Sequence, residues 1–272
     1  MIISNELAEK FARLKNYLRE LSSAAIAFSG GVDSTFLLKV AHDTLGDKVL
    51  ALTAASAFVP QSEINAAKKF CDSNGIRQKI FAADVLTVEG VKENPANRCY
   101  LCKRALFKNF LRLAEENQLA AVVEGSNMDD LGDYRPGMKA LAELDIKSPL
   151  RLAELYKSEI RELSRALNLP TAAKPSMACL ATRFPYGETL TAEKLSRVEA
   201  AEEFLLSEGF NQLRVRVHGK IARIEISPDD FAKTIELRGK LVEKFKSLGF
   251  DYVTLDLQGY RVGSMNAGLR MD

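Results

Sequence analysis

The chain has 272 residues, enough for one large domain or two of modest size. Hydrophobic residues make up 47% of it, an ordinary share for a globular protein, which excludes disorder as the main state. Lys and Arg total 38 against 36 Asp and Glu, a balance that argues against a dedicated nucleic-acid or membrane-surface binder. No apolar run approaches the roughly 20 residues of a membrane span, and no signal peptide is recognisable. We therefore expect a cytoplasmic enzyme.

The first 170 residues alternate helical and strand patterns. Apolar residues from Leu7 to Leu21 recur at helical spacing, and a short buried strand follows at residues 24–28. Further helices are predicted over 35–45, 61–73 and 101–117, and further strands over 48–54, 77–82, 120–124 and, more weakly, 146–150. This alternation is typical of an α/β fold, a doubly wound parallel sheet covered by helices on both faces.

The pattern changes after Pro170. Residues 171–190 have no periodicity and are expected to form a loop or linker. Residues 191–272 are predicted to form a smaller α+β domain, with helices over 192–207 and 228–248 and strands over 212–218, 221–227 and 252–257.

The first two of these strands predict a hairpin. Leu213, Val215 and Val217 alternate with Arg214, Arg216 and His218, which indicates a half-exposed antiparallel pair turning at Gly219-Lys220. Arg214 and Arg216 would then present two guanidinium groups on one face, suited to a nucleotide phosphate or paired carboxylates. Glu225 on the partner strand could orient one of them. Salt bridges on the strand surface are the alternative.

A candidate phosphate loop, Ser29-Gly-Gly-Val-Asp-Ser34, joins the first strand to the next helix. Gly30 and Gly31 allow backbone amides to approach an oxyanion, and the hydroxyls of Ser29 and Ser34 add donors near a helix dipole that favours anions. Asp33 could hold Mg²⁺ beside a phosphate. The lysine of a Walker loop is absent, so none is placed for γ-phosphate chemistry. A plain strand-to-helix turn is the alternative.

A polar loop follows the fourth strand, at the same edge of the sheet. It contains Asn127, Asp129, Asp130, Asp133 and Arg135. Its carboxylates could bind Mg²⁺, and its arginine could bind a phosphate or carboxylate through two hydrogen bonds. A solvated acidic loop is the alternative.

Four cysteines are too few for a disulfide scaffold. Cys99 and Cys102 form a C-x-x-C pair at a helix start and, with one distant cysteine, could ligate an iron–sulfur cluster. Zinc with an unidentified fourth ligand also fits, whereas a redox disulfide lacks a thioredoxin-like context. Cys179 lies near Lys174 and Arg183 in sequence, charges that favour a thiolate. Cys71 shares a helix with Ile64, Ala67 and Phe70 and is expected in the core.

Together these motifs resemble a known family. The loop at 29–34 resembles the PP-loop of the adenine-nucleotide alpha hydrolase superfamily, whose members cleave ATP between its α and β phosphates. With the segments 99–103, 124–137, 174–187 and 214–218, the chain resembles the LarE family. Members are ATP-dependent sulfur transferases that build the nickel-pincer nucleotide cofactor of lactate racemase.

The resemblance implies a mechanism. A carboxylate of pyridinium-3,5-biscarboxylic acid mononucleotide is adenylated, sulfur attacks the acyl adenylate, and two rounds give the bisthiocarboxylate. Cys179 occupies the sulfur-bearing position of the family, which in many members is left as dehydroalanine. A cluster-bearing branch instead holds a 4Fe–4S cluster on three cysteines, here Cys99, Cys102 and Cys179, whose free iron binds an external sulfide.

Residue chemistry and resemblance together define the expected site. The cofactors are ATP, Mg²⁺ on Asp33 and a 4Fe–4S cluster, and Cys179 is the expected catalytic residue. Contacts to nucleotide or substrate are expected from Ser29, Gly30, Gly31, Asp33, Ser34, Gly125, Asn127, Asp130, Arg135, Arg183, Arg214, Arg216 and Glu225.

The resemblance also implies a homo-oligomer, with a hexamer as one form, and a C-terminal domain for substrate binding and oligomerisation. A PP-loop tRNA thiolation enzyme is the alternative function. It would need a basic surface, which the near-neutral charge does not indicate, so no stable nucleic-acid partner is expected. A nucleotide-binding regulator without catalysis is a further alternative.

Overall fold

The computed structural model describes residues 4–132, 136–175 and 178–261. The chain forms two compact units. The first contains residues 1–88 and 97–177, and the second contains residues 89–96 and 178–272. The sequence predicted two contiguous domains, residues 1–170 and 191–272. It did not predict that residues 89–96 belong to the second unit, and we call this segment the excursion.

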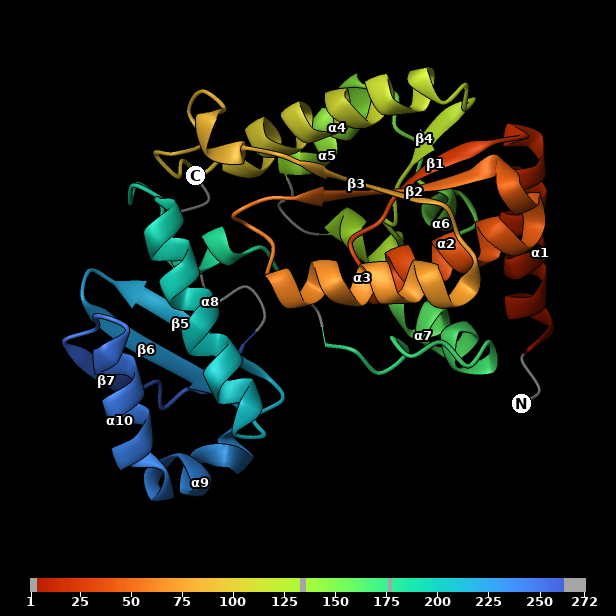
Figure 1. The fold of residues 1–272 in the computed structure, drawn as a ribbon. Coiled ribbons are helices and arrows are strands. Elements are labelled where there is room, and N and C mark those ends of the chain that lie inside the picture. The colour runs from red at the N-terminus through yellow and green to blue at the C-terminus, as the bar shows by residue number, and fades with distance from the viewer. Residues whose placement is uncertain (1–3, 133–135, 176–177, 262–272) are drawn as a thin grey trace. The chain divides into compact units, whose positions relative to one another are not determined.

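The first unit contains a four-stranded parallel sheet, as predicted for this fold class (Figure 1). Its strands are β1 (Ala24–Ala27), β2 (Val49–Ala55), β3 (Gln78–Ala82) and β4 (Ala121–Val123). They lie in the order β3-β2-β1-β4, so the chain proceeds outward on one side of β1 and then returns to its other side. The carboxyl ends of β1 and β4 therefore meet at the point where a doubly wound sheet binds ligands.

Helices cover both faces of this sheet (Figure 1). On one face lie α1 (Asn5–Leu21), α2 (Val32–Leu45), α3 (Gln61–Asn74) and α7 (Lys157–Ala166); on the other lie α4 (Arg98–Glu116) and α5 (Pro136–Glu143). Alternate residues of β1 supply the two cores, since Ala24 and Ile26 pack with the first set and Ala25 with the second. Small side chains on β1 let both helix layers pack closely against it.

The predicted fifth strand at 146–150 is wrong. Lys147 forms one isolated parallel bridge with Val123, donating its N–H to Val122 at 3.1 Å and accepting from Glu124 at 2.9 Å. The short helix α6 (Pro149–Leu152) begins two residues later. Proline suits the first position of a helix, where its missing N–H would have no partner. The apolar run is therefore buried as a turn and helix start.

The second unit is the predicted α+β domain. It comprises α8 (Ala192–Ser207), β5 (Leu213–His218), β6 (Ile221–Ile226), α9 (Phe231–Glu236), α10 (Arg238–Ser247) and β7 (Tyr252–Leu255). The antiparallel hairpin of β5 and β6 is confirmed, and β7 lies parallel to β6. The single helix predicted over 228–248 is wrong, because the helix is interrupted at Leu237, two residues before the helix-disfavouring Gly239.

Short 3-10 turns complete the described elements: η1 (Gly46–Lys48), η2 (Val85–Thr87), η3 (Met128–Gly132), η4 (Leu180–Arg183) and η5 (Pro228–Asp230). None of the helices in the described ranges is long and apolar enough to cross a membrane.

Residues 89–96 are fixed within the second unit by one buried asparagine. The Asn94 side chain donates to the carbonyls of Phe184 at 3.4 Å and Pro185 at 2.7 Å. The backbone carbonyl of Asn94 accepts the N–H of Gly187 at 2.9 Å. Asn94 is fully buried and has a φ of 52°, a left-handed conformation that asparagine tolerates better than most residues. The loop after η4 is therefore held by a segment far upstream in the chain.

Candidate active site

The predicted phosphate loop lies between β1 and α2. Gly30 has a φ of 71°, the left-handed region that favours glycine. The hydroxyl oxygens of Ser29 and Ser34 lie 3.1 Å apart, and the Ser34 hydroxyl also donates to the Gly31 carbonyl at 3.3 Å. Gly31 is the N-cap of α2 and offers no side chain to the first-turn amides. Those amides can therefore bind an anionic ligand.

Asp33 is the charged residue of this loop. One of its carboxylate oxygens accepts from the ammonium of Lys157. The other, Oδ1, is buried and has no hydrogen-bond partner in the part of the chain that the structure describes. A buried carboxylate oxygen without a partner is costly, and oxygen is the ligand that Mg²⁺ prefers. The residue thus fits a magnesium ion beside a phosphate.

Lys157, at the start of α7, is a site residue that sequence reasoning missed. It is 124 positions from Asp33, so no local spacing relates the two. Its backbone N–H donates to Asp129 at 2.6 Å, which fixes the helix start beside the loop after β4. The loop sequence lacks the lysine of a Walker motif, but a lysine reaches the phosphate loop from elsewhere in the fold.

The loop after β4 packs directly against the start of α2. A Cβ on Gly125 would lie 3.1 Å from the Ser34 nitrogen and 3.3 Å from the Asp33 backbone carbon. Asn127 donates its N–H to Asp130 at 2.9 Å, and its side chain accepts from Asp129 at 3.0 Å. These polar groups therefore shape the loop itself. Asp133 and Arg135 lie outside the described residues.

Lys174 is bound to the phosphate loop. Its ammonium donates to the Gly30 carbonyl at 3.0 Å and to Glu63 at 2.5 Å. Arg161 holds the same segment through the carbonyls of Ala172 and Lys174, at 2.6 and 2.8 Å. The charge of Lys174 is thus paired within the first unit, which weakens the prediction that it favours a thiolate at Cys179.

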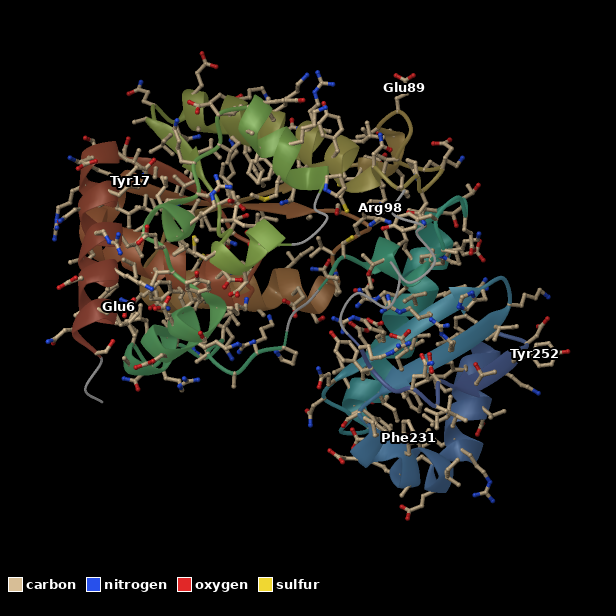
Figure 2. The ribbon with its side chains drawn as sticks, turned by 180° about the vertical axis from the view of Figure 1, so that it is seen from behind. Glu6, Tyr17, Glu89, Arg98, Phe231 and Tyr252 are labelled. Carbon is tan, nitrogen blue, oxygen red and sulfur yellow. The ribbon has the colours of Figure 1, made fainter. Side chains whose placement is uncertain are left out.

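The C-x-x-C pair lies at the start of α4. Cys99 and Cys102 are half-buried and three positions apart, so both thiols lie on one side of the helix. The neighbouring Arg98, labelled in Figure 2, has its guanidinium nitrogen 3.6 Å from the Cys99 sulfur. Cys71 belongs to the core, as predicted, and burial raises its pKa to about 12.

Cys179 begins the turn η4 in the second unit. Its carbonyl accepts from the backbone and hydroxyl of Thr182 at 3.0 and 2.8 Å, and from Arg183 at 3.1 Å. Arg183 is fully buried and forms two hydrogen bonds with Glu202, at 2.9 and 2.8 Å. Arg183 holds the backbone of the cysteine turn, and its predicted contact with a nucleotide or substrate stays a prediction.

The arginines of β5 are buried, so the half-exposed hairpin that the alternation predicts is wrong. Arg216 donates to Glu225 at 3.0 Å and to the Thr182 carbonyl at 2.8 Å, because the cysteine turn covers this part of the sheet. Arg214 is 6% exposed. Burial, and then the nearby charge of Arg183, lower the pKa of Arg214. A buried guanidinium at this place is suited to bind an anion.

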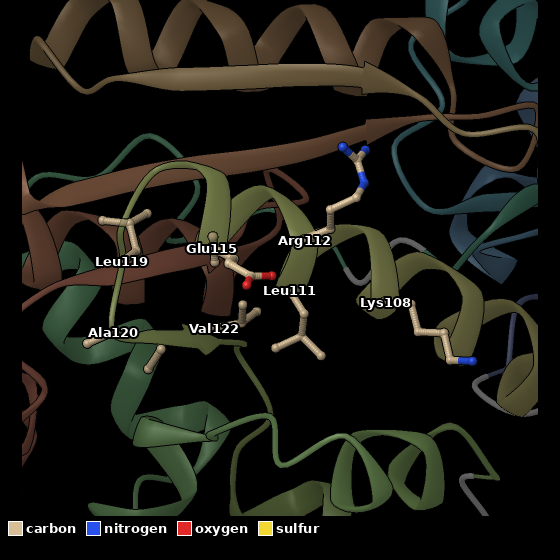
Figure 3. A pocket seen from close by; sticks show the side chains of 9 residues that line it. Lys108, Leu111, Arg112, Glu115, Leu119, Ala120 and Val122 are labelled. Carbon is tan, nitrogen blue, oxygen red and sulfur yellow. The ribbon is translucent and has the colours of Figure 1, made fainter.

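An open groove of about 510 Å³ lies elsewhere in the first unit (Figure 3). It is lined by α4 residues such as Lys108 and Arg112, by Ala120 just before β4, and by Val122 on that strand. It contains none of the predicted site residues. Within the described ranges, no three His, Cys, Asp or Glu side chains gather to form a metal site.

Comparison with known proteins identifies the family. The family model of NAD synthase matches residues 6–185. The pyridinium-3,5-bisthiocarboxylic acid mononucleotide synthase of Lactiplantibacillus plantarum is 38% identical over 261 residues, which cover 96% of this chain and 95% of that protein. The chain belongs to the LarE family.

Other relatives align with this LarE-family chain over nearly its whole length. An uncharacterised protein of Synechocystis sp. is 42% identical over 96% of this chain and 98% of its own. An uncharacterised protein of Methanocaldococcus jannaschii is 32% identical over 93% and 98%. The predicted PP-loop superfamily and enzyme class are confirmed: the LarE-family chain is an ATP-dependent, adenylating sulfur transferase.

Proposed function

We propose that this LarE-family protein converts the carboxylates of pyridinium-3,5-biscarboxylic acid mononucleotide to thiocarboxylates, for a nickel-pincer nucleotide cofactor. The Lactiplantibacillus plantarum relative is named for the bisthiocarboxylic acid product. The observation that carries the proposal is the Asp33 oxygen that lies beside a phosphate-binding loop and has no hydrogen-bond partner among the described residues. It provides the place at which ATP can be activated for attack.

In the adenylation step, a substrate carboxylate oxygen attacks the α-phosphorus of ATP. The bond from that phosphorus to the bridging oxygen breaks, and pyrophosphate leaves. The amides at the start of α2 and the hydroxyls of Ser29 and Ser34 bind the departing phosphates. Asp33 would hold Mg²⁺, which neutralises phosphate charge when bound. Lys157, which donates to the other carboxylate oxygen of Asp33, would add a positive charge at the same place.

The second unit would bind the substrate and the sulfur donor. Arg214 and Arg216 would bind the phosphate or a carboxylate of the mononucleotide, and Glu225 would hold Arg216 in place. The thiol of Cys179 would lie at the start of a turn fixed by Arg183 and Glu202. A nucleophilic sulfur attacks the acyl carbon of the adenylate, the carbon–oxygen bond breaks, and AMP leaves.

Two sulfur sources fit this step. Cys179 itself could attack, giving a thioester; loss of the Cα proton and cleavage of its Cβ–S bond would then leave dehydroalanine and a thiocarboxylate. Alternatively, Cys99, Cys102 and Cys179 would hold a 4Fe–4S cluster, which supplies an open iron site for external sulfide. The two thiols on one side of α4 fit a pair of cluster ligands.

The presence of Cys99 and Cys102 supports the cluster-borne source, because sacrificial use of Cys179 needs neither of these thiols. We favour the cluster-borne source, and we also propose a homo-oligomer, which light scattering of the purified protein would test.

Replacement of Asp33 tests the nucleotide site. Asp33→Asn should reduce ATP-dependent pyrophosphate release at least a hundredfold, because the neutral amide cannot hold Mg²⁺ against a phosphate. Asp43→Asn is the matched control, since Asp43 lies on the same helix and pairs with Lys39 at the surface. It should retain wild-type release. Equal activity of the two variants would reject the assignment.

Replacement of the cysteine pair tests the sulfur source. Cys99→Ala and Cys102→Ala should each remove bound iron from anaerobically purified protein and abolish repeated turnover with added sulfide. Pyrophosphate release should continue in both variants, because the adenylation residues are untouched. Wild-type protein that contains no iron, and whose Cys179 has lost the mass of H₂S after one round, would establish the sacrificial route instead.

A further inference from the structure

The second unit contains an aromatic residue against Arg214 that the sequence patterns did not single out. The Arg214 guanidinium carbon lies 5.1 Å from the centroid of the Tyr260 ring. One of its nitrogens, Nη2, donates to the Tyr260 hydroxyl at 3.5 Å. A guanidinium is attracted to the negative face of an aromatic ring. Tyr260 therefore restricts both the position and the rotation of this cation.

The backbone places Tyr260 firmly. Gly259 has a φ of 69°, and a Cβ there would lie 3.0 Å from the Ile226 carbonyl and 3.1 Å from Pro228. The Tyr260 N–H donates to the same Ile226 carbonyl at 2.8 Å, and the Gly259 N–H donates to Asp256 at 3.0 Å. This turn brings the chain back across the end of β6. Only glycine at position 259 lets the chain pass this close to the Ile226 carbonyl, and this passage places the Tyr260 ring against Arg214.

Arg214 is buried among other cations. Its guanidinium lies against the Tyr260 ring and donates to the Leu213 carbonyl at 2.6 Å. Burial, and then the nearby charge of Arg183, lower its pKa. The side chain has also lost most of its contact with water. A guanidinium held between a ring and backbone in this way is pre-organised to bind an anionic group.

We propose that Tyr260 is a positioning residue, which holds the Arg214 guanidinium in the orientation that binds a phosphate or carboxylate of the pyridinium mononucleotide. The inference rests on the proposed function, since it takes the ligand of Arg214 from it. The ring lies against the guanidinium, and the hydroxyl accepts from Nη2. The role of Tyr260 is therefore in affinity for the mononucleotide and not in affinity for ATP.

The test compares two tyrosines of the second unit. Tyr260→Leu should weaken binding of pyridinium-3,5-biscarboxylic acid mononucleotide about tenfold, equivalent to about 1.4 kcal/mol, with ATP affinity unchanged. Tyr260→Phe keeps the ring and should bind within about threefold of wild type, since the ring supplies most of the restraint. Tyr252→Leu is the control, because Tyr252 on β7 is 65% exposed and points away from the unit (Figure 2). It should bind both ligands as wild type does.

A double-mutant cycle tests whether Tyr260 acts through Arg214. In an Arg214→Met background, Tyr260→Leu should cause no further loss of mononucleotide binding. The same measurements with the dephosphorylated nucleoside identify the anion: a persisting Tyr260 effect indicates a carboxylate, and its disappearance indicates the phosphate. If Tyr260→Leu does not fold, Tyr260→Gln replaces it with the same expectation.

The outcomes separate this inference from the function on which it rests. Mononucleotide binding by Tyr260→Leu within twofold of wild type, equal weakening of ATP, or additive losses in the cycle would each overturn the role of Tyr260 alone. A wild-type protein that binds ATP and does not bind the mononucleotide would overturn the proposed substrate and this inference together.

Discussion

Gly125 sets the distance between the end of β4 and the PP-loop. No larger residue fits there without moving Ser34 or Asp33, since an added Cβ would lie within 3.3 Å of both. Gly125→Ala should therefore shift the loop by a few tenths of an ångström and lower ATP-dependent pyrophosphate release about tenfold to a hundredfold. Steady-state release with saturating substrate measures this, and circular dichroism checks that the fold is kept.

The matched control for this change is Gly239→Ala. Gly239 lies in α10 with nothing within 4 Å of an added Cβ. Alanine is the better helix former, so the free energy of unfolding should rise by about 0.5–1 kcal/mol while pyrophosphate release stays at the wild-type rate. A Gly125→Ala protein as active as the Gly239→Ala protein would show that the close approach has no catalytic importance.

At the scale of elements, periodicity predicted the positions of most helices and strands because it reports which face of each is buried. It failed where burial came from another part of the chain. Arg214 and Arg216 alternate with apolar residues and look half-exposed, yet the cysteine turn and Tyr260 cover them. Lys157 could not be found at all, because only the fold brings it to Asp33. Motifs predicted the candidate site, and a long-range contact adds Lys157 to it.

The excursion of residues 89–96 depends on the side chain of Asn94. Asn94→Ala loses two hydrogen bonds to the carbonyls of Phe184 and Pro185, and it places alanine in a left-handed conformation. Unsatisfied buried carbonyls cost about 1–3 kcal/mol, and the left-handed conformation about 1–2 kcal/mol more. We expect the free energy of unfolding to fall by about 2–5 kcal/mol in urea titrations.

Asn168→Ala separates these two contributions. Asn168 has a φ of 54°, close to the 52° of Asn94, and is exposed to solvent. Its replacement should cost only the conformational part, about 1–2 kcal/mol. The difference between the two losses in free energy of unfolding then measures the contribution of the buried hydrogen bonds of Asn94. Equal losses would mean that the excursion is not held by that side chain.

For the whole molecule, the two units are not independent pieces of sequence. The second unit includes residues 89–96, so a fragment of residues 178–272 lacks the segment that binds Gly187 and Leu190. That fragment should show no cooperative thermal transition. Joining residues 89–96 to its amino end through a flexible Gly/Ser linker should restore one. Circular dichroism measures the thermal transitions of the fragments with and without residues 89–96. The same transition in both would contradict this prediction.

The same excursion imposes an order on synthesis by the ribosome. Residues 97–177, which number 81, separate the segment 89–96 from the rest of its unit. At about 5–20 residues per second, translation of that stretch takes about 4–16 s. Throughout this interval Val91 and Asn94, both buried in the finished protein, have no partners to cover them. The sheet of the first unit can form in that time, while residues 89–96 stay exposed and open to binding by a chaperone.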